Sequence, residues 1–156
     1  MNPPMESQTL EAWRANLIED DAGIAAIVRT MKRVAVLGMK TEAQRGEPAF
    51  YVPAYLVEQG VEVVPVPVYY PEATEILGAK VVRRVVDAGG AIDVVDVFRR
   101  PRDVASHVED LIAARPAVVW LQLGIRDDAS AERLARAGIK VVQDRCLLVD
   151  HRRFAA

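Results

Sequence analysis

Five short segments of the chain are apolar with almost no interruption. Three of them are rich in valine and span residues 33–37, 61–66 and 117–121, and two further candidates span residues 93–98 and 139–142. A strand covered on both faces has this unbroken pattern, whereas a strand with one wet face alternates between apolar and polar residues. The pattern therefore predicts five strands that pair in parallel.

Segments with a helical period separate these strands. Apolar residues recur in them at spacings of three and four, which places them on one face of a helix. The three stripes consist of Val52, Tyr55 and Leu56, of Val104, Val108, Leu111 and Ile112, and of Ala131, Leu134 and Ala135. Gly60 and Gly138 stand where a left-handed residue commonly ends a helix, so helices are expected between the strands.

Two regions are harder to assign. Residues 76–88 contain two valine pairs that fit either a helix or a strand, and we expect a loop followed by a short helix around residues 83–87. Residues 10–28 also have helical character, which Asp20 and Asp21 are expected to interrupt because an aspartate N-cap can restart a helix. This N-terminal piece is expected to pack on the edge of the domain.

Strands that alternate with helices imply right-handed crossovers and a parallel sheet with helices on both faces. The predicted fold is therefore α/β, a Rossmann-like, doubly wound sheet of five mainly parallel strands. We expect an N-terminal helical extension at residues 1–30 and one domain at residues 31–156. No internal repeat or long Gly/Ser linker indicates a second domain.

Composition and charge narrow the classes of partner. The chain has 20 Lys and Arg against 22 Asp and Glu, so a nucleic-acid-binding surface spread over the whole protein is not expected. No apolar run approaches the roughly 20 residues of a membrane span, and the start of the chain lacks the features of a secretion signal. With one cysteine, the chain can form no internal disulfide. The expected location is the cytoplasm.

The loop after the first strand is a candidate anion-binding site. In a parallel sheet, ligands lie beyond the carboxyl ends of the strands, where the strand order reverses. This loop begins with Gly38, carries Lys40 and Arg45, and leads into a predicted helix N-terminus. Glycine lets the backbone approach a phosphate, while free N–H groups and cations attract it. An ordinary connecting loop would explain the same residues.

Residues at the ends of two later strands extend this candidate site. Phe98 could pack on an adenine, and Arg99 beside it could meet a phosphate. Further along, Gln122 is a polar group at a strand end and Gly124 permits a tight turn. The alternatives are a core role for Phe98 and a simple loop after Gln122.

No catalytic or metal-binding set is expected. Cys146 follows Arg145, which could stabilise a thiolate, but no base stands near it in sequence, so a small buried residue is the favoured interpretation. His107 and His151 are dispersed, and together with one cysteine they lack metal-ligand spacing.

Five motifs in order resemble the stand-alone CoA-binding domain family, relatives of the N-terminal domain of the succinyl-CoA synthetase alpha subunit. The motifs are V-A-V-L-G at residues 34–38, E-I-L-G at 75–78, V-D-V-F-R at 95–99, V-W-L-Q-L-G-I at 119–125 and D-R-C at 144–146. The resemblance covers residues 31–154. It implies a Rossmann-like fold that holds coenzyme A across the carboxyl edge of the sheet.

The resemblance also implies the residues that contact the ligand. Its phosphate loop, its turn after the second strand and its two later strand ends map onto Gly38, Met39, Lys40, Arg45, Pro67, Val68, Val97, Phe98, Arg99, Gln122 and Gly124. Relatives with several domains use a phosphorylated histidine of a further domain, which has no matching position here. Neither of the two histidines is therefore expected to inherit that role.

Two positions depart from the family pattern. In the family an arginine commonly precedes a proline directly, whereas Gly46 and Glu47 stand between Arg45 and Pro48 here and add a negative charge near the phosphates. The family also tends to have Asn-Pro after the second strand, where this chain has Pro67 followed by valine. Both changes are expected to reduce affinity for coenzyme A or to change the ligand.

The expected function is non-catalytic binding of coenzyme A or an acyl-CoA through its ADP and pyrophosphate portion, by a module that an acyl-CoA enzyme could use as a partner. One alternative is an NAD(P)- or other nucleotide-dependent enzyme, although the uncharged residues 64–68 lack an acidic ribose ligand. Another alternative is a Rossmann-like interaction domain whose site has decayed. A homodimer through an exposed sheet edge also remains open.

Overall fold

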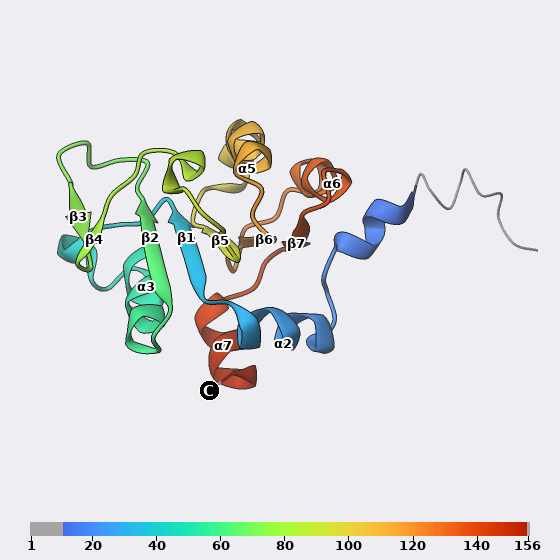
Figure 1. Ribbon diagram of the computed structural model, residues 1–156, viewed down its shortest axis with the longest axis horizontal. Coiled ribbons are helices and arrows are strands. Elements are labelled where there is room, and N and C mark those ends of the chain that lie inside the picture. Colours follow the sequence, from blue (N-terminus) through green and yellow to red (C-terminus); the bar gives the residue numbers. More distant parts are fainter. Residues whose placement is uncertain (1–10, 156) are drawn as a thin grey trace, which may run out of the picture.

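Five parallel strands form a central sheet, as the apolar runs predict (Figure 1). The structure is a computed structural model that describes residues 11–155. The strands are β1 Arg33–Leu37, β2 Glu62–Val66, β5 Val94–Val97, β6 Val118–Leu121 and β7 Lys140–Val142, in the order β2-β1-β5-β6-β7. Both faces of the sheet are buried, which explains why the runs are continuous rather than alternating.

Helices cover both faces of this sheet (Figure 1). On one face lie α2 Asp21–Thr30, α3 Pro48–Glu58 and α7 Leu147–Phe154, and on the other lie α5 Val108–Ala114 and α6 Asp128–Arg136. The short helices α4 Pro101–Val104 and η4 Ala105–His107 lead into α5. The predicted α/β, Rossmann-like architecture is confirmed. No helix within residues 11–155 is long and apolar enough to cross a membrane.

The connection between β2 and β5 differs from the prediction. A small hairpin of β3 Glu75–Ile76 and β4 Ala79–Lys80 replaces the expected loop, and the expected short helix is the 3₁₀ helix η3 Val85–Ala88. The hairpin forms because Leu77 and Gly78 adopt positive φ angles of 53° and 75° at its turn, while Ile76 beside them is buried. No period in the sequence marks such short strands.

Residues 12–18 pack along the edge of the sheet that β7 forms. The helix η1 Ala12–Asn16 ends before Asp20, whose side chain caps α2 as expected. Between the two helices, Leu17 bridges to Val141 of β7, and the next backbone N–H donates to the Val141 carbonyl at 2.9 Å. The predicted start of this helical piece at Leu10 lies outside the described residues. The predicted domain division at residue 30 stays a prediction.

The other edge of the sheet is also partly covered by the chain itself. The N–H of Val82, which follows the small hairpin, donates to the carbonyl of Pro65 in β2 at 3.0 Å. Since a segment of the same chain contacts each outer strand, pairing of two copies edge to edge would have to displace one of these segments. The homodimer stays a prediction.

A carboxyl group lies in the middle of the core. Asp96 of β5 is fully buried, and its neighbours across the sheet are Val36 of β1 and Trp120 of β6. Neither of its oxygens has a hydrogen-bond partner among the described residues. Burial alone raises the pKa of Asp96 well above its usual value, because a charged carboxylate loses its hydration there.

Candidate functional site

The strand order reverses between β1 and β5, and Gly38 marks this point. The chain passes from β1 outward to β2, whereas β5, β6 and β7 follow one another in the opposite direction. Gly38 has a φ of +85°, and a Cβ built on it would lie 2.3 Å from the carbonyl oxygen of Phe98. Only glycine therefore allows the two strand ends to approach this closely.

A cavity of about 460 Å³ opens at this carboxyl edge. Its walls come from the loop after β1, the first turn of α3, the ends of β5 and β6, and the residue before α7. Four of the residues expected from the sequence meet in it, namely Lys40, Phe98, Arg99 and Gln122. Phe98 is half-buried, and it both packs against the core and lines the cavity. A core role and a position in the cavity wall therefore do not exclude each other for this residue.

The other expected residues do not line this cavity. The side chains of Met39 and Val97 are buried in the core. Arg45 is exposed, with its guanidinium 5.9 Å from the ring centre of Phe50. The remaining members of the expected set, Gly38, Pro67, Val68 and Gly124, lie in the loops beyond the strand ends. Contact of any of these residues with a ligand stays a prediction.

Three neighbours hold the side chain of Arg99 in place. Its Nε–H donates to Nε2 of His107 at 3.1 Å, its Nη2 lies 3.8 Å from the carboxylate of Asp103, and its guanidinium lies 5.6 Å from the ring centre of Tyr69. Burial, and then the charge of Arg99, lower the pKa of His107, while Asp110 and Asp103 oppose this shift. The lowered pKa favours the neutral imidazole, and that is the form whose Nε2 can accept the hydrogen bond from Arg99.

Lys40 also lines the cavity, and its ammonium group is paired with a carboxylate. Its ammonium Nζ lies 2.5 Å from Oε1 of Glu47, the residue just before α3. The loop between them is ordered by a capping box, in which Thr41 and Gln44 exchange hydrogen bonds around η2 Glu42–Gln44. The sequence predicts a negative charge at Glu47 near the phosphates, but only the structure shows that this carboxylate pairs with Lys40.

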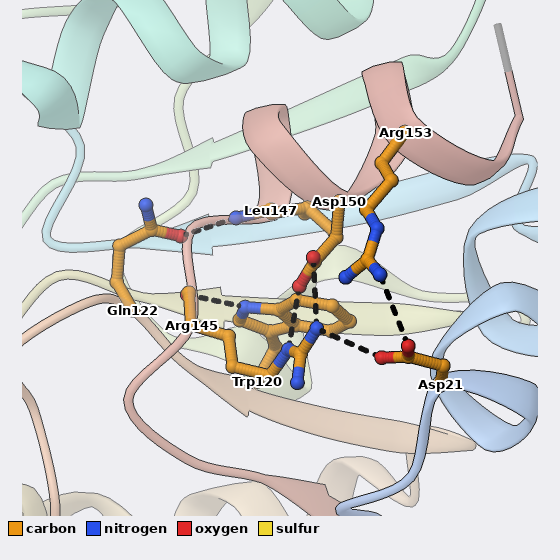
Figure 2. Close-up of polar contacts among 7 residues, drawn as sticks. All are labelled: Asp21, Trp120, Gln122, Arg145, Leu147, Asp150 and Arg153. Carbon is orange, nitrogen blue, oxygen red and sulfur yellow. Dashed lines mark hydrogen bonds and ion pairs between the residues drawn. The ribbon is translucent and has the colours of Figure 1, made fainter.

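Gln122, which follows β6, has an amide of which only the oxygen is paired. Its Oε1 accepts the N–H of Leu147 at 3.2 Å, as Figure 2 shows, which fixes the orientation of the amide because a backbone N–H can only donate. The side chain is 4% exposed, and its NH₂ group has no partner among the described residues. The amide is therefore a free hydrogen-bond donor at the cavity.

An ion-pair network fixes α7 and the chain before it (Figure 2). Arg145 donates two hydrogen bonds, of 2.7 and 3.0 Å, to the buried carboxylate of Asp150, and its carbonyl accepts the indole N–H of Trp120 at 2.8 Å. These hydrogen bonds to Asp150 raise the pKa of Arg145. Asp21 of α2 pairs with both Arg145 and Arg153. The motif at residues 144–146 thus supports the site, a role that no spacing in the sequence indicated, because Arg145 precedes α7 and lies five residues from Asp150.

Cys146 and His151 lie in different parts of the fold. Cys146 is a free, half-buried cysteine in the cavity wall rather than a fully buried residue. His151, expected in a charged tail, is instead buried in α7, where its Nδ1 lies 2.8 Å from the hydroxyl of Tyr55. Burial lowers the pKa of His151. In the described part of the chain, no three His, Cys, Asp or Glu side chains gather as a metal site would require.

Comparison with known proteins identifies the family of this chain. The model of the family described as "CoA binding domain" matches residues 32–152. An uncharacterized protein of Bacillus subtilis (strain 168), YneT, is 31% identical over 130 residues, which cover 83% of this chain and 93% of that protein.

Solved structures agree with this match. A Thermus thermophilus protein solved as cell-free ID.343 is 40% identical, with a TM-score of 0.79 over 87% of this chain and 99% of that chain. A hypothetical protein from Pyrococcus horikoshii OT3 is 28% identical, with a TM-score of 0.77 over 99% of this chain and 97% of that chain. These relatives match nearly their whole length, so the similarity extends over the entire fold.

Proposed function

Because the chain belongs to the CoA binding domain family, we propose that it binds coenzyme A or an acyl-CoA at the carboxyl edge of its sheet. The observation that carries this proposal is the cavity at the strand reversal beside Gly38, which both Lys40 and Arg99 line. Such a cavity with cations in its wall suits the pyrophosphate of a nucleotide cofactor. The proposed role is that of a binding or regulatory module.

The residues in the cavity fit different portions of this ligand. The guanidinium of Arg99 and the ammonium of Lys40 would bind phosphate oxygens, and the Phe98 ring would pack on the adenine. The free NH₂ of Gln122 would donate to a carbonyl of the ligand, because a ligand that covered this group without accepting its hydrogen bond would leave it buried and unpaired, which costs energy. Glycine at position 38 lets the backbone approach the pyrophosphate.

Titration calorimetry tests this proposal, with CoA as ligand and acetyl-CoA, NAD and ADP for comparison. We expect CoA to bind with a Kd in the micromolar range, about −8 kcal/mol, more tightly than ADP, and NAD not to bind. The substitution Arg99→Gln should weaken CoA binding by about 10-fold or more, because one charged hydrogen bond contributes about 1.5–3 kcal/mol.

The matched control is Arg102→Gln. Arg102 is an exposed arginine of α4, three residues from Arg99, and it does not line the cavity. Its loss removes the same charge and should leave CoA affinity within about twofold. Equal effects of the two substitutions would mean that only overall charge matters. Tighter binding of NAD than of CoA would favour the oxidoreductase alternative, and binding of neither would favour a decayed site.

One observation favours a second candidate, acyl transfer through a thiol. Cys146 lines the same cavity as Arg99, so an acyl group carried on CoA could come within reach of its sulfur. If this candidate is right, the Cys146 thiolate should attack the thioester carbonyl of acetyl-CoA, break its C–S bond and release the CoA thiol, which leaves an acetyl thioester on the protein. Cys146→Ala should then abolish the labelling detected by mass spectrometry. We expect no such labelling and unchanged CoA affinity in Cys146→Ala, which supports the binding module.

A further inference from the structure

The ammonium group of Lys40 already forms an ion pair with a carboxylate of the same chain. Its Nζ lies 2.5 Å from Oε1 of Glu47, and both residues line the cavity. Their side chains are 33% and 48% exposed, so the pair faces solvent on the ligand side. An incoming phosphate would meet the carboxylate together with the ammonium.

The helix that begins beside Glu47 does not need this carboxylate. Glu47 is the N-cap of α3, yet its side chain makes no capping hydrogen bond. Its backbone carbonyl accepts the N–H groups of Phe50 and Tyr51 at 2.9 and 3.0 Å, and Pro48 at the first helical position has no N–H to offer. The side chain is thus free to leave Lys40 without unwinding the helix.

The loop as a whole carries no net charge. Residues 40–47 contain two cations, Lys40 and Arg45, and two carboxylates, Glu42 and Glu47. Arg99 of the same cavity differs, because its nearest carboxylate is 3.8 Å away and its side chain is only 13% exposed. An anion can therefore approach Arg99 without breaking a short ion pair, but it can reach Lys40 only by displacing Glu47.

We propose that Glu47 is an autoinhibitory residue that competes with the ligand's phosphate for Lys40 and so lowers the affinity of the site for anions. This inference rests on the proposed binding of coenzyme A at the same cavity. Small anions gain too little to displace the carboxylate, whereas a ligand that also contacts Arg99 and Phe98 has other interactions to offset the exchange. The same cost therefore keeps free phosphate or pyrophosphate off the site at concentrations at which the full nucleotide still binds.

The substitution Glu47→Gln tests this directly, with CoA and inorganic pyrophosphate as the two probes in calorimetry. It keeps the size of the side chain and removes its charge. We expect both probes to bind about 3- to 5-fold more tightly, which matches the upper end of the strength of an exposed ion pair. The control is Glu132→Gln, which removes an exposed carboxylate paired with Arg136 on α6, away from the cavity, and should change neither affinity.

A double-substitution cycle separates competition for Lys40 from long-range repulsion. We expect Lys40→Met to weaken binding of both probes. In the Lys40→Met background, Glu47→Gln should increase affinity less than twofold, because Glu47 then forms no ion pair that the ligand must displace. A full gain that persists without Lys40 would overturn the competition. Unchanged or weaker binding in Glu47→Gln alone would overturn it as well.

The two probes also separate this inference from the proposed function. If pyrophosphate binding improves in Glu47→Gln while CoA binds to neither protein, the competition stands and the proposed CoA binding fails. If CoA binds the unmodified protein but Glu47→Gln gains nothing with either probe, the proposed function stands and the competition fails. Binding of neither probe to any variant would contradict both.

Discussion

Gly38→Ala is expected to destabilise the protein by about 2–4 kcal/mol and to weaken CoA binding by at least about 10-fold. The new methyl group would lie 2.3 Å from the carbonyl oxygen of Phe98 and 3.3 Å from Cδ of Arg99, so the end of β5 must move away from β1. Overpacking of this kind costs about 1–3 kcal/mol, and a non-glycine residue at a φ of +85° adds about 1–2 kcal/mol.

The loss of affinity follows from the residues that this movement displaces. Phe98 and Arg99 form the part of the cavity wall that the ligand is proposed to contact, so a shift of the end of β5 displaces both of them. Urea denaturation and CoA titration of the same sample measure the two effects.

Gly60→Ala is the matched control for the backbone strain. Gly60, which follows α3, has nearly the same φ, +83°, but a Cβ there meets no atom within 4 Å. The Gly60→Ala protein should therefore lose about 1–2 kcal/mol of stability and none of its CoA affinity. If Gly38→Ala behaved like Gly60→Ala, the close approach of β1 and β5 would not matter to the site.

Asp96→Asn is expected to raise the free energy of unfolding at pH 8 by about 2 kcal/mol, although it removes a charge from the protein. The carboxyl is fully buried without a partner, and burying an unsatisfied or charged polar group is costly. Asparagine has almost the same shape but cannot ionise, so it avoids the free-energy cost of burying an ionised carboxylate.

The gain should depend on pH in a defined direction. The pKa of Asp96 is raised in the folded protein, so the unfolded chain releases its proton at a lower pH than the folded protein does. The Asp96 carboxyl therefore does not change the free energy of unfolding below about pH 4, the usual pKa of aspartate. As the pH rises from there toward the pKa in the folded protein, the carboxyl lowers the free energy of unfolding. The difference between Asp96→Asn and the unmodified protein should be small near pH 4 and grow toward pH 8.

Thermal unfolding followed by circular dichroism at pH 4.5, 6 and 8 would measure this dependence. Asp87→Asn, at an exposed aspartate of η3, is the control and should show no pH-dependent gain. A constant difference across this pH range would mean that Asp96 is solvated or paired in solution, contrary to its position between β1 and β6.

Local patterns were sufficient to predict most of the fold. Strands such as β1 and β5 could be placed because burial on both faces demands unbroken valine-rich runs, and α6 because its apolar spacing and its terminal glycine agree. The hairpin at residues 75–80 could not be predicted, because two-residue strands have no period and depend on the burial of Ile76 against distant residues.

The sequence by itself also placed Lys40, Phe98, Arg99 and Gln122 at one edge, because the carboxyl ends of parallel strands must lie together. Only the tertiary structure decided which partners these side chains have. The pairing of Lys40 with Glu47, the contact of Arg99 with His107 and the isolation of Asp96 depend on where neighbouring strands and helices place their side chains. Spacing along the chain determines a residue's element and edge, whereas its charge state and freedom to bind depend on atoms that the fold brings within a few ångströms.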